Sequence, residues 1–115
     1  MDRLKRAEVR RGDLVTVALQ GDLGKPRPAL VVQTDLVPDY PSVVVLPMTT
    51  TLVSAPLVRI TVEAMPETGL RTISQIMIDK PSTVPRQRLG PTVGRIDDDT
   101  LGRVSRSLAV WLGLA

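Results

Sequence analysis

The chain of 115 residues contains no cysteine and no histidine. Without cysteine, neither a disulfide bond nor a thiolate metal site can form. Without histidine, the usual general base, the commonest metal ligand and every Ser-His or Cys-His nucleophile pair are missing. The sequence therefore excludes catalysis by a thiol or an imidazole of this chain.

Aromatic residues and long apolar runs are also scarce. There is no phenylalanine, one tryptophan and one tyrosine, yet 43% of the residues are hydrophobic, so valine and leucine must fill the core. A chain of this length suits a single domain, which we expect to span residues 1–115. No stretch approaches the roughly 20 apolar residues of a membrane span. Residues 1–10 are basic and lack the apolar segment of a secretory signal. We therefore expect a flexible basic N-terminal arm and a cytoplasmic protein.

The charge balance is mildly basic. The net charge is +3 and the isoelectric point is near 10. Such a surface favours a polyanionic partner, although a charge of this size is common among proteins of other kinds.

Strand patterns occupy the first two thirds of the chain. Alternating or continuous runs of β-branched and aliphatic residues predict strands over 13–19, 28–33, 43–48, 57–62 and 70–78. Pro47 is expected to end or bulge the third of these strands. The first strand should be buried on much of both faces, because apolar residues occupy both of its alternating sets.

The last third changes to a helical period. Apolar residues from Ile96 to Leu112 recur at helical spacing, Asp97 is a good N-cap, and Gly113 supplies a stop. Trp111 belongs to the same apolar stripe, which predicts that it is buried. The acidic run 97–99 could suggest a metal site, but three consecutive residues entering a helix do not converge on one ion, so we interpret the run as capping. The expected fold is mainly β, a small barrel or strongly bent antiparallel sheet with a C-terminal helix.

The most informative segment lies at the start of the second predicted strand. Pro26 and Pro28 fix their own φ angles and favour extended geometry in the residues before them, so Arg27 has little backbone freedom. A guanidinium held in this way suits phosphate, whose oxygens match its planar fork of donors. A surface ion pair is the alternative role for this arginine.

Four short motifs in this order resemble the PemK/MazF-type toxins of bacterial toxin–antitoxin systems. They are Arg-Gly-Asp-Leu-Val at 11–15, Lys-Pro-Arg-Pro-Ala-Leu-Val-Val at 25–32, Pro-Met-Thr-Thr at 47–50 and Ser-Gln-Ile at 74–76. The likeness runs from about Arg10 to the C-terminal helix. It implies an SH3-like barrel of five to seven antiparallel strands. It also implies a homodimer without a cofactor or a metal site.

The resemblance further implies an endoribonuclease that cleaves single-stranded RNA, often mRNA, without a metal ion. The 2′-hydroxyl of the RNA would attack the adjacent phosphate and leave a 2′,3′-cyclic phosphate. Transferred by motif, the catalytic residues are Arg27 and Thr49, with Thr50 as the reserve candidate. The loop before the arginine is shorter than in many family members. Asp22 could there replace the glutamate that those members carry, and the preferred RNA sequence is left open.

Several other residues are candidates for supporting roles. Gln75, among apolar neighbours, is predicted to be a buried hydrogen-bond hub that supports the site. Tyr40 could stack one base, although a turn-filling role suits it better. Positive residues on predicted loops or strand ends could track the RNA backbone if they share a face with Arg27. These are Lys25, Arg71, Lys80, Arg86 and Arg88.

The resemblance also implies a partner, a cognate antitoxin whose disordered acidic C-terminal segment folds across a basic groove. Two alternatives to the ribonuclease remain open. The chain is similar in layout to the CcdB-type toxins, which poison DNA gyrase through a tryptophan near the C-terminus, and Trp111 occupies such a position. The third possibility is a barrel that binds RNA without cutting it.

Overall fold

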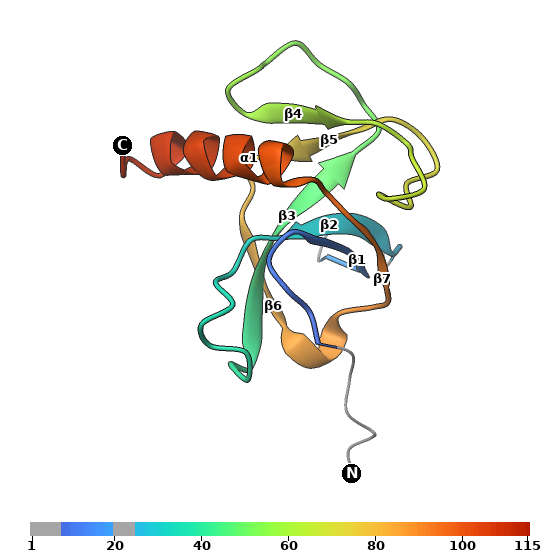
Figure 1. Cartoon of the computed structure of the whole chain (residues 1–115), viewed down its shortest axis with the longest axis vertical. Coiled ribbons are helices and arrows are strands. Elements are labelled where there is room, and N and C mark those ends of the chain that lie inside the picture. Colours follow the sequence, from blue (N-terminus) through green and yellow to red (C-terminus); the bar gives the residue numbers. More distant parts are fainter. Residues whose placement is uncertain (1–7, 20–24) are drawn as a thin grey trace.

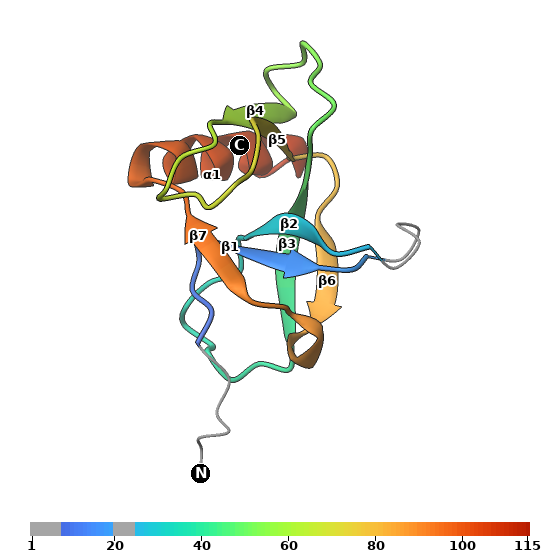
Figure 2. The ribbon, with the colours of Figure 1, turned by 90° about the vertical axis from the view of Figure 1, so that its right-hand side faces the viewer.

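A curled antiparallel sheet and one helix make up the fold (Figures 1 and 2). The structure is a computed structural model that describes residues 8–19 and 25–115. Within these residues the elements are β1 (Asp13–Val17), β2 (Arg27–Val31), β3 (Ser42–Thr49), β4 (Arg59–Val62), β5 (Ser74–Met77), β6 (Ser82–Pro85), a single 3-10 turn (Arg86–Arg88), β7 (Thr92–Arg95) and α1 (Asp98–Trp111).

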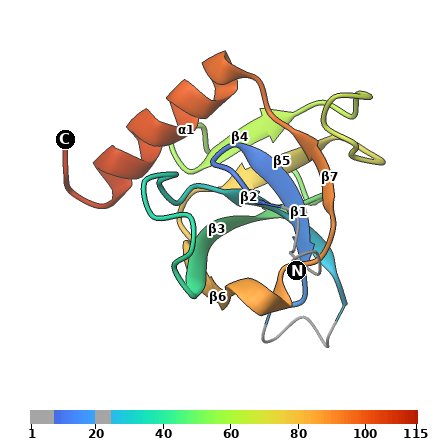
Figure 3. The ribbon, with the colours of Figure 1, turned by 60° about the horizontal axis from the view of Figure 1, so that its bottom comes forward.

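The long strand β3 organises the sheet. The strand order is β4-β5-β3-β2-β1-β7, and β6 pairs with β3 outside this path. The first half of β3 pairs with β6, up to Val45, and its end pairs with β5, from Met48 onward. Because β3 exchanges one neighbour for another along its length, the sheet bends strongly around it (Figure 3). This confirms the predicted barrel-like sheet with a C-terminal helix.

Two hydrophobic cores lie on the two faces of β1, β2 and β3. Alternation sends Leu14, Leu30 and Leu46 into one core, where Val104 of α1 packs against them. The neighbouring residues Val15, Val31 and Val45 enter the other core, which β6 covers with Val84. These side chains are almost completely buried. The prediction that the first strand is buried on both faces is therefore confirmed.

The helix begins and ends as its sequence indicates. Asp97 caps it by accepting a hydrogen bond from the Thr100 N–H at 3.0 Å, which confirms the capping interpretation. The side-chain and backbone hydrogen bonds from Thr100 hold the pKa of Asp97 below its usual value. Gly113 follows the helix with a positive φ of 76°. None of the helices in the described residues is long and apolar enough to cross a membrane.

Trp111 is more exposed than the sequence predicts. It was expected in the buried apolar stripe, but 48% of its surface is exposed, and Leu112 is 53% exposed. The helix extends beyond the sheet, so its last turn lies outside the core that Leu101, Val104 and Leu108 cover (Figure 1).

The main differences between the predicted and the observed strands concern β3, β5, β6 and β7. Strand β3 continues through Pro47, which stands opposite Ala29 in the register with β2. Pro47 lies where β3 changes neighbour from β6 to β5, so its missing N–H costs the ladder little. The strand predicted over 70–78 begins only at Ser74, because residues before it form a turn. Strands β6 and β7 were missed, since each has four residues with proline or glycine within or beside it.

Candidate functional site

A groove of about 520 Å³ brings together four of the residues that the sequence singles out. Arg27, Thr49, Thr50 and Arg71 all line it. They come from the start of β2, the end of β3 and the loop between β4 and β5, which are distant in sequence. The other lining residues are Thr16, Pro26, Pro28, Met48, Gly69, Leu70, Thr72, Ser74 and Val93.

Arg27 is the first residue of β2 and the last to pair with β1, opposite Val17. Its side chain is exposed, whereas Ala29 and Leu30, two and three residues further on, are completely buried. The guanidinium is thus carried at the mouth of a strand that the core holds firmly in place. The flanking prolines limit its backbone further, as expected from the sequence.

Thr49 ends β3 and is half-buried on the groove wall. Its Oγ1 accepts a hydrogen bond from the Thr51 N–H at 3.1 Å, which fixes the orientation of the hydroxyl. A hydroxyl that accepts in this way keeps its own proton for donation. Thr50, the reserve candidate, is exposed next to it.

Gln75 is the buried hydrogen-bond hub that the sequence predicts. It is 6% exposed and lies opposite Thr49 in the register of β3 with β5. Its amide Nε2 donates to the Val53 carbonyl at 3.0 Å and to Thr61 Oγ1 at 3.2 Å, and its Oε1 accepts from the Val53 N–H at 3.0 Å. Gln75 therefore fastens the segment that follows Thr49 to the sheet beneath it.

The electrostatics of the groove are one-sided. Arg27 and Arg71 supply two guanidinium groups, and no carboxylate from the described residues lines the groove. The rest of the polar lining is hydroxyl-bearing, from threonine and serine. Such a surface can donate hydrogen bonds to phosphate oxygens without repelling them. Asp22, the predicted supporting carboxylate, lies outside the described residues.

The remaining basic candidates are not gathered at this groove. Lys25 is exposed and adjoins Pro26 on the groove wall. Lys80 lies at the far end of β5, with its Nζ 3.8 Å from Asp79 Oδ2. Arg86 donates from Nε to the Tyr40 carbonyl at 2.7 Å. The structure thus places Arg71 beside the predicted catalytic pair, whereas Lys80 and Arg86 lie elsewhere on this chain, and Arg88 sits on the 3-10 turn.

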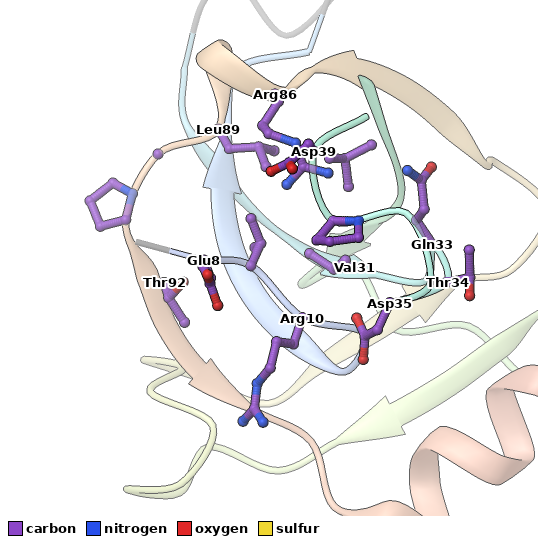
Figure 4. A pocket seen from close by; sticks show the side chains of 15 residues that line it. Glu8, Arg10, Val31, Gln33, Thr34, Asp35, Asp39, Arg86, Leu89 and Thr92 are labelled. Carbon is purple, nitrogen blue, oxygen red and sulfur yellow. The ribbon is translucent and has the colours of Figure 1, made fainter. Parts of the chain in front are cut away.

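A second and larger groove, of about 810 Å³, contains Arg86 (Figure 4). Its lining includes the carboxylates of Glu8, Asp35 and Asp39 together with the guanidinium groups of Arg10 and Arg86. The acidic groups outnumber the basic ones, so this groove has no surplus of positive charge.

Two groove residues, Thr16 and Ser74, were missed by sequence reasoning. Thr16 stands opposite Pro28 in the register of β1 with β2, so strand pairing rather than a motif brings it to the site. Ser74 is buried and donates from Oγ to the Thr72 carbonyl at 3.0 Å, which fixes the chain at the entrance to β5. The Ser-Gln-Ile motif at 74–76 could have pointed to Ser74 as well as to Gln75.

With its curled sheet, terminal helix and arginine-threonine groove, the molecule has the small-barrel architecture that its motifs predict. Residues 10–112 match the family described as "PemK-like, MazF-like toxin of type II toxin-antitoxin system". The chain is 48% identical over 108 residues to the "Probable endoribonuclease MazF" of Mycolicibacterium smegmatis, covering 93% of this chain and 99% of that protein. The chain therefore belongs to the PemK/MazF toxin family, as its motifs predict.

Solved structures agree with this fold. The Mycobacterium tuberculosis toxin MazF-mt6 superposes with a TM-score of 0.77 at 24% identity, covering 90% of this chain and 98% of that one. The MazF of a MazE-MazF crystal structure from Deinococcus radiodurans superposes with a TM-score of 0.76 at 22% identity, covering 96% and 100%. At these identities the likeness establishes the shared architecture.

Proposed function

We propose that this protein is the toxin of a type II toxin–antitoxin system and that it cuts single-stranded RNA in the groove lined by Arg27, Thr49 and Arg71. The observation that carries the proposal is the meeting of these three side chains in one groove without a carboxylate from the described residues. The name of the relative from M. smegmatis, a probable endoribonuclease, supports the same activity.

The reaction begins with the RNA itself. The 2′-hydroxyl attacks the adjacent phosphorus, so a bond forms between O2′ and phosphorus while the bond to the 5′ oxygen breaks. The 2′ proton passes to water, and the departing 5′ oxygen takes up a proton. The products are a 2′,3′-cyclic phosphate and a 5′-hydroxyl end. Because the nucleophile belongs to the substrate and is already next to the phosphorus, the protein has only to orient the strand and to stabilise charge.

Arg27 is suited to charge stabilisation. Negative charge grows on the non-bridging oxygens as the phosphorus becomes five-coordinate, and a guanidinium donates to two such oxygens at once. Its rigid mounting on β2 means that little reorganisation is needed when this charge develops. Arginine stays protonated at any physiological pH and is therefore a poor base, so stabilisation is its principal role.

Thr49 is suited to proton donation. Its oxygen already accepts from the Thr51 N–H, so its proton points away toward other acceptors. In the groove this proton bonds a phosphate oxygen, or it passes to the departing 5′ oxygen while water returns a proton to the Thr49 oxygen. Arg71 binds a neighbouring phosphate of the strand, and Lys25 extends the positive surface beside it.

The partner surfaces follow from the same charge pattern. An acidic, extended segment of a cognate antitoxin would neutralise the groove arginines and keep RNA out. The family resemblance further suggests a homodimer and a cytoplasmic location, where RNA and antitoxin are both present.

The test is cleavage of single-stranded RNA by the purified protein in EDTA, with identification of the product ends. We expect a 2′,3′-cyclic phosphate, and cutting about 10³-fold slower by a folded Arg27→Ala variant. Intact RNA across varied sequences, or an Arg27→Ala variant as active as the parent, would overturn the proposal.

A further inference from the structure

The loop that joins β4 to β5, residues 63–73, lies directly against the backbone of β7 (Figure 2). The Arg95 N–H donates to the Glu67 carbonyl at 2.8 Å. A Cβ added to Gly69 would stand 1.9 Å from the Val93 carbonyl oxygen, and one added to Gly94 would stand 2.1 Å from the Thr68 carbonyl oxygen. Both segments therefore lack a side chain where they meet, and a residue other than glycine would not allow this approach.

Inside the loop, Thr68 holds the turn together. Its side chain is buried, and Oγ1 lies 3.1 Å from the Met65 N, 3.4 Å from the Leu70 N, 3.0 Å from the Glu63 carbonyl and 3.1 Å from the Met65 carbonyl. A hydroxyl can accept from the two amides and donate its one proton to either carbonyl. Valine has the same shape but can do neither.

The residues on both sides of Arg71 are fixed. Leu70 is buried in the core that α1 covers, and the Thr72 carbonyl accepts from Ser74 Oγ at 3.0 Å. Gly69 has a φ of 68°, a conformation that other residues rarely adopt. The backbone on which Arg71 stands is therefore held by the core, by the Thr68 hydroxyl and by β7.

Arg71 itself is exposed in the groove. Its side chain has no hydrogen bond or ion pair with any residue of the described ranges, so its donors are available to a ligand. We propose that Thr68, together with Gly69 and Gly94, positions Arg71 opposite Arg27, so that Arg71 binds a phosphate next to the one that is cut. This inference rests on the proposed RNA-cutting function.

The consequence is a specific kinetic signature. A contact with a phosphate that does not react is equally strong in the bound substrate and in the transition state, so its loss raises KM and leaves kcat unchanged. Because its backbone is held in place, Arg71 loses less backbone freedom on binding than a guanidinium on a mobile loop. Freeing the loop should therefore weaken RNA binding even though Arg71 is still present.

The main experiment is a double-mutant cycle of Thr68→Val with Arg71→Gln, measured as kcat and KM and as the Kd of an uncleavable 2′-deoxy strand. We expect each single variant to raise KM and Kd about tenfold, the loss of one charge-assisted contact, with kcat within about twofold. The double variant should be no weaker than Arg71→Gln alone, because Thr68 acts through Arg71. Thr68→Ser, which keeps the hydroxyl, should bind like the parent.

A matched control is Thr83→Val on the exposed side of β6, which changes the same residue type outside both groove and loop. The positioning role would be overturned if the increases in KM of the two single variants multiplied in the double variant. It would also be overturned if Thr68→Ser bound RNA as weakly as Thr68→Val, or if Thr83→Val weakened binding equally.

Hydrogen exchange of the unaltered protein tests the same inference without relying on any variant to fold. The Gly69 amide, bonded to the Met65 carbonyl, and the Arg95 amide, bonded to the Glu67 carbonyl, should exchange at least about a hundredfold more slowly than in an unstructured peptide. Rapid exchange of these amides in a protein that still cuts RNA would contradict the positioning role but not the proposed function. An unaltered protein that does not cut RNA would contradict the proposed function, and with it the role of Arg71.

Discussion

The two grooves of this protein differ in a way that size does not reveal. The larger groove, of about 810 Å³, mixes three carboxylates with two guanidinium groups, whereas the smaller one, of about 520 Å³, combines two guanidinium groups with hydroxyls. A polyanion would meet repulsion in the first and only donors in the second. The comparison teaches that a phosphate-binding site is identified better by the sign and uniformity of its charge than by its volume. The rigidity of the groups that carry the charge matters as well.

The largest expected effect comes from removing the rigid guanidinium of the smaller groove. Arg27→Ala should lower kcat about 10³-fold, because one preorganised group that stabilises transition-state charge is worth this order of magnitude. Arg10→Ala, which removes an exposed guanidinium from the larger groove, should change kcat and KM by less than about twofold. Rates are measured on single-stranded RNA, and thermal melting checks that both variants fold. Equal losses would abolish the distinction between the grooves.

The next effect sharpens the assignment of the hydroxyl. Thr49→Val should lower kcat about 10²-fold, the lower end of what a positioned proton donor contributes. Thr50→Val should cost less than about fivefold, because Thr50 is exposed beside the site and its hydroxyl is not oriented by a hydrogen bond from the described backbone. Single-turnover cleavage rates of the two variants give the comparison. A larger loss from Thr50→Val would move the catalytic role by one residue.

A smaller effect concerns salt. If the smaller groove follows the RNA backbone, log KM should rise with log salt, with a slope of about 0.7 for each phosphate contact on a single strand. Arg71→Gln should reduce this slope by about 0.7, and Arg10→Ala should leave it unchanged. The measurement is KM over a series of potassium chloride concentrations. An unaltered slope in Arg71→Gln would mean that Arg71 contacts no phosphate.

The smallest effect is expected at the far end of α1. Because Trp111 is half exposed, Trp111→Ala should lower the free energy of unfolding by only about 1 kcal/mol, well below the ~3 kcal/mol of a buried tryptophan. RNA cleavage should be unchanged, since the residue does not line the groove. Urea unfolding and a cleavage assay check both statements. A variant that still cuts RNA but has lost its toxicity in cells would instead favour the gyrase alternative.

The sequence predicted the parts of the site that depend on local rules. The proline-arginine-proline segment marks the mouth of a strand from the pattern alone, whereas Thr49 was singled out by the family resemblance. The helix could be placed by its period and by the capping of Asp97, which the hydrogen bond from Thr100 confirms.

What the sequence could not predict depends on contacts between distant segments. The alternation from residue 70 onward predicts a strand, but Gly69 and the bonds of Thr68 turn the chain there instead. The close approach of Gly69 and Gly94, 25 positions further on, leaves no trace in local periodicity. In the same way, Pro47 remains within β3 because of a change of neighbour that only the assembled sheet produces.

The most direct test of the central claim is a comparison of two RNA strands that differ by one atom. One carries the 2′-hydroxyl at the cleaved linkage and the other carries hydrogen there, and both are incubated with the protein in EDTA. The account predicts that only the first strand is cut, at that linkage, leaving a 2′,3′-cyclic phosphate. Equal cutting of both strands would show that the nucleophile is not the RNA's own hydroxyl, and would contradict the role given to Arg27 and Thr49.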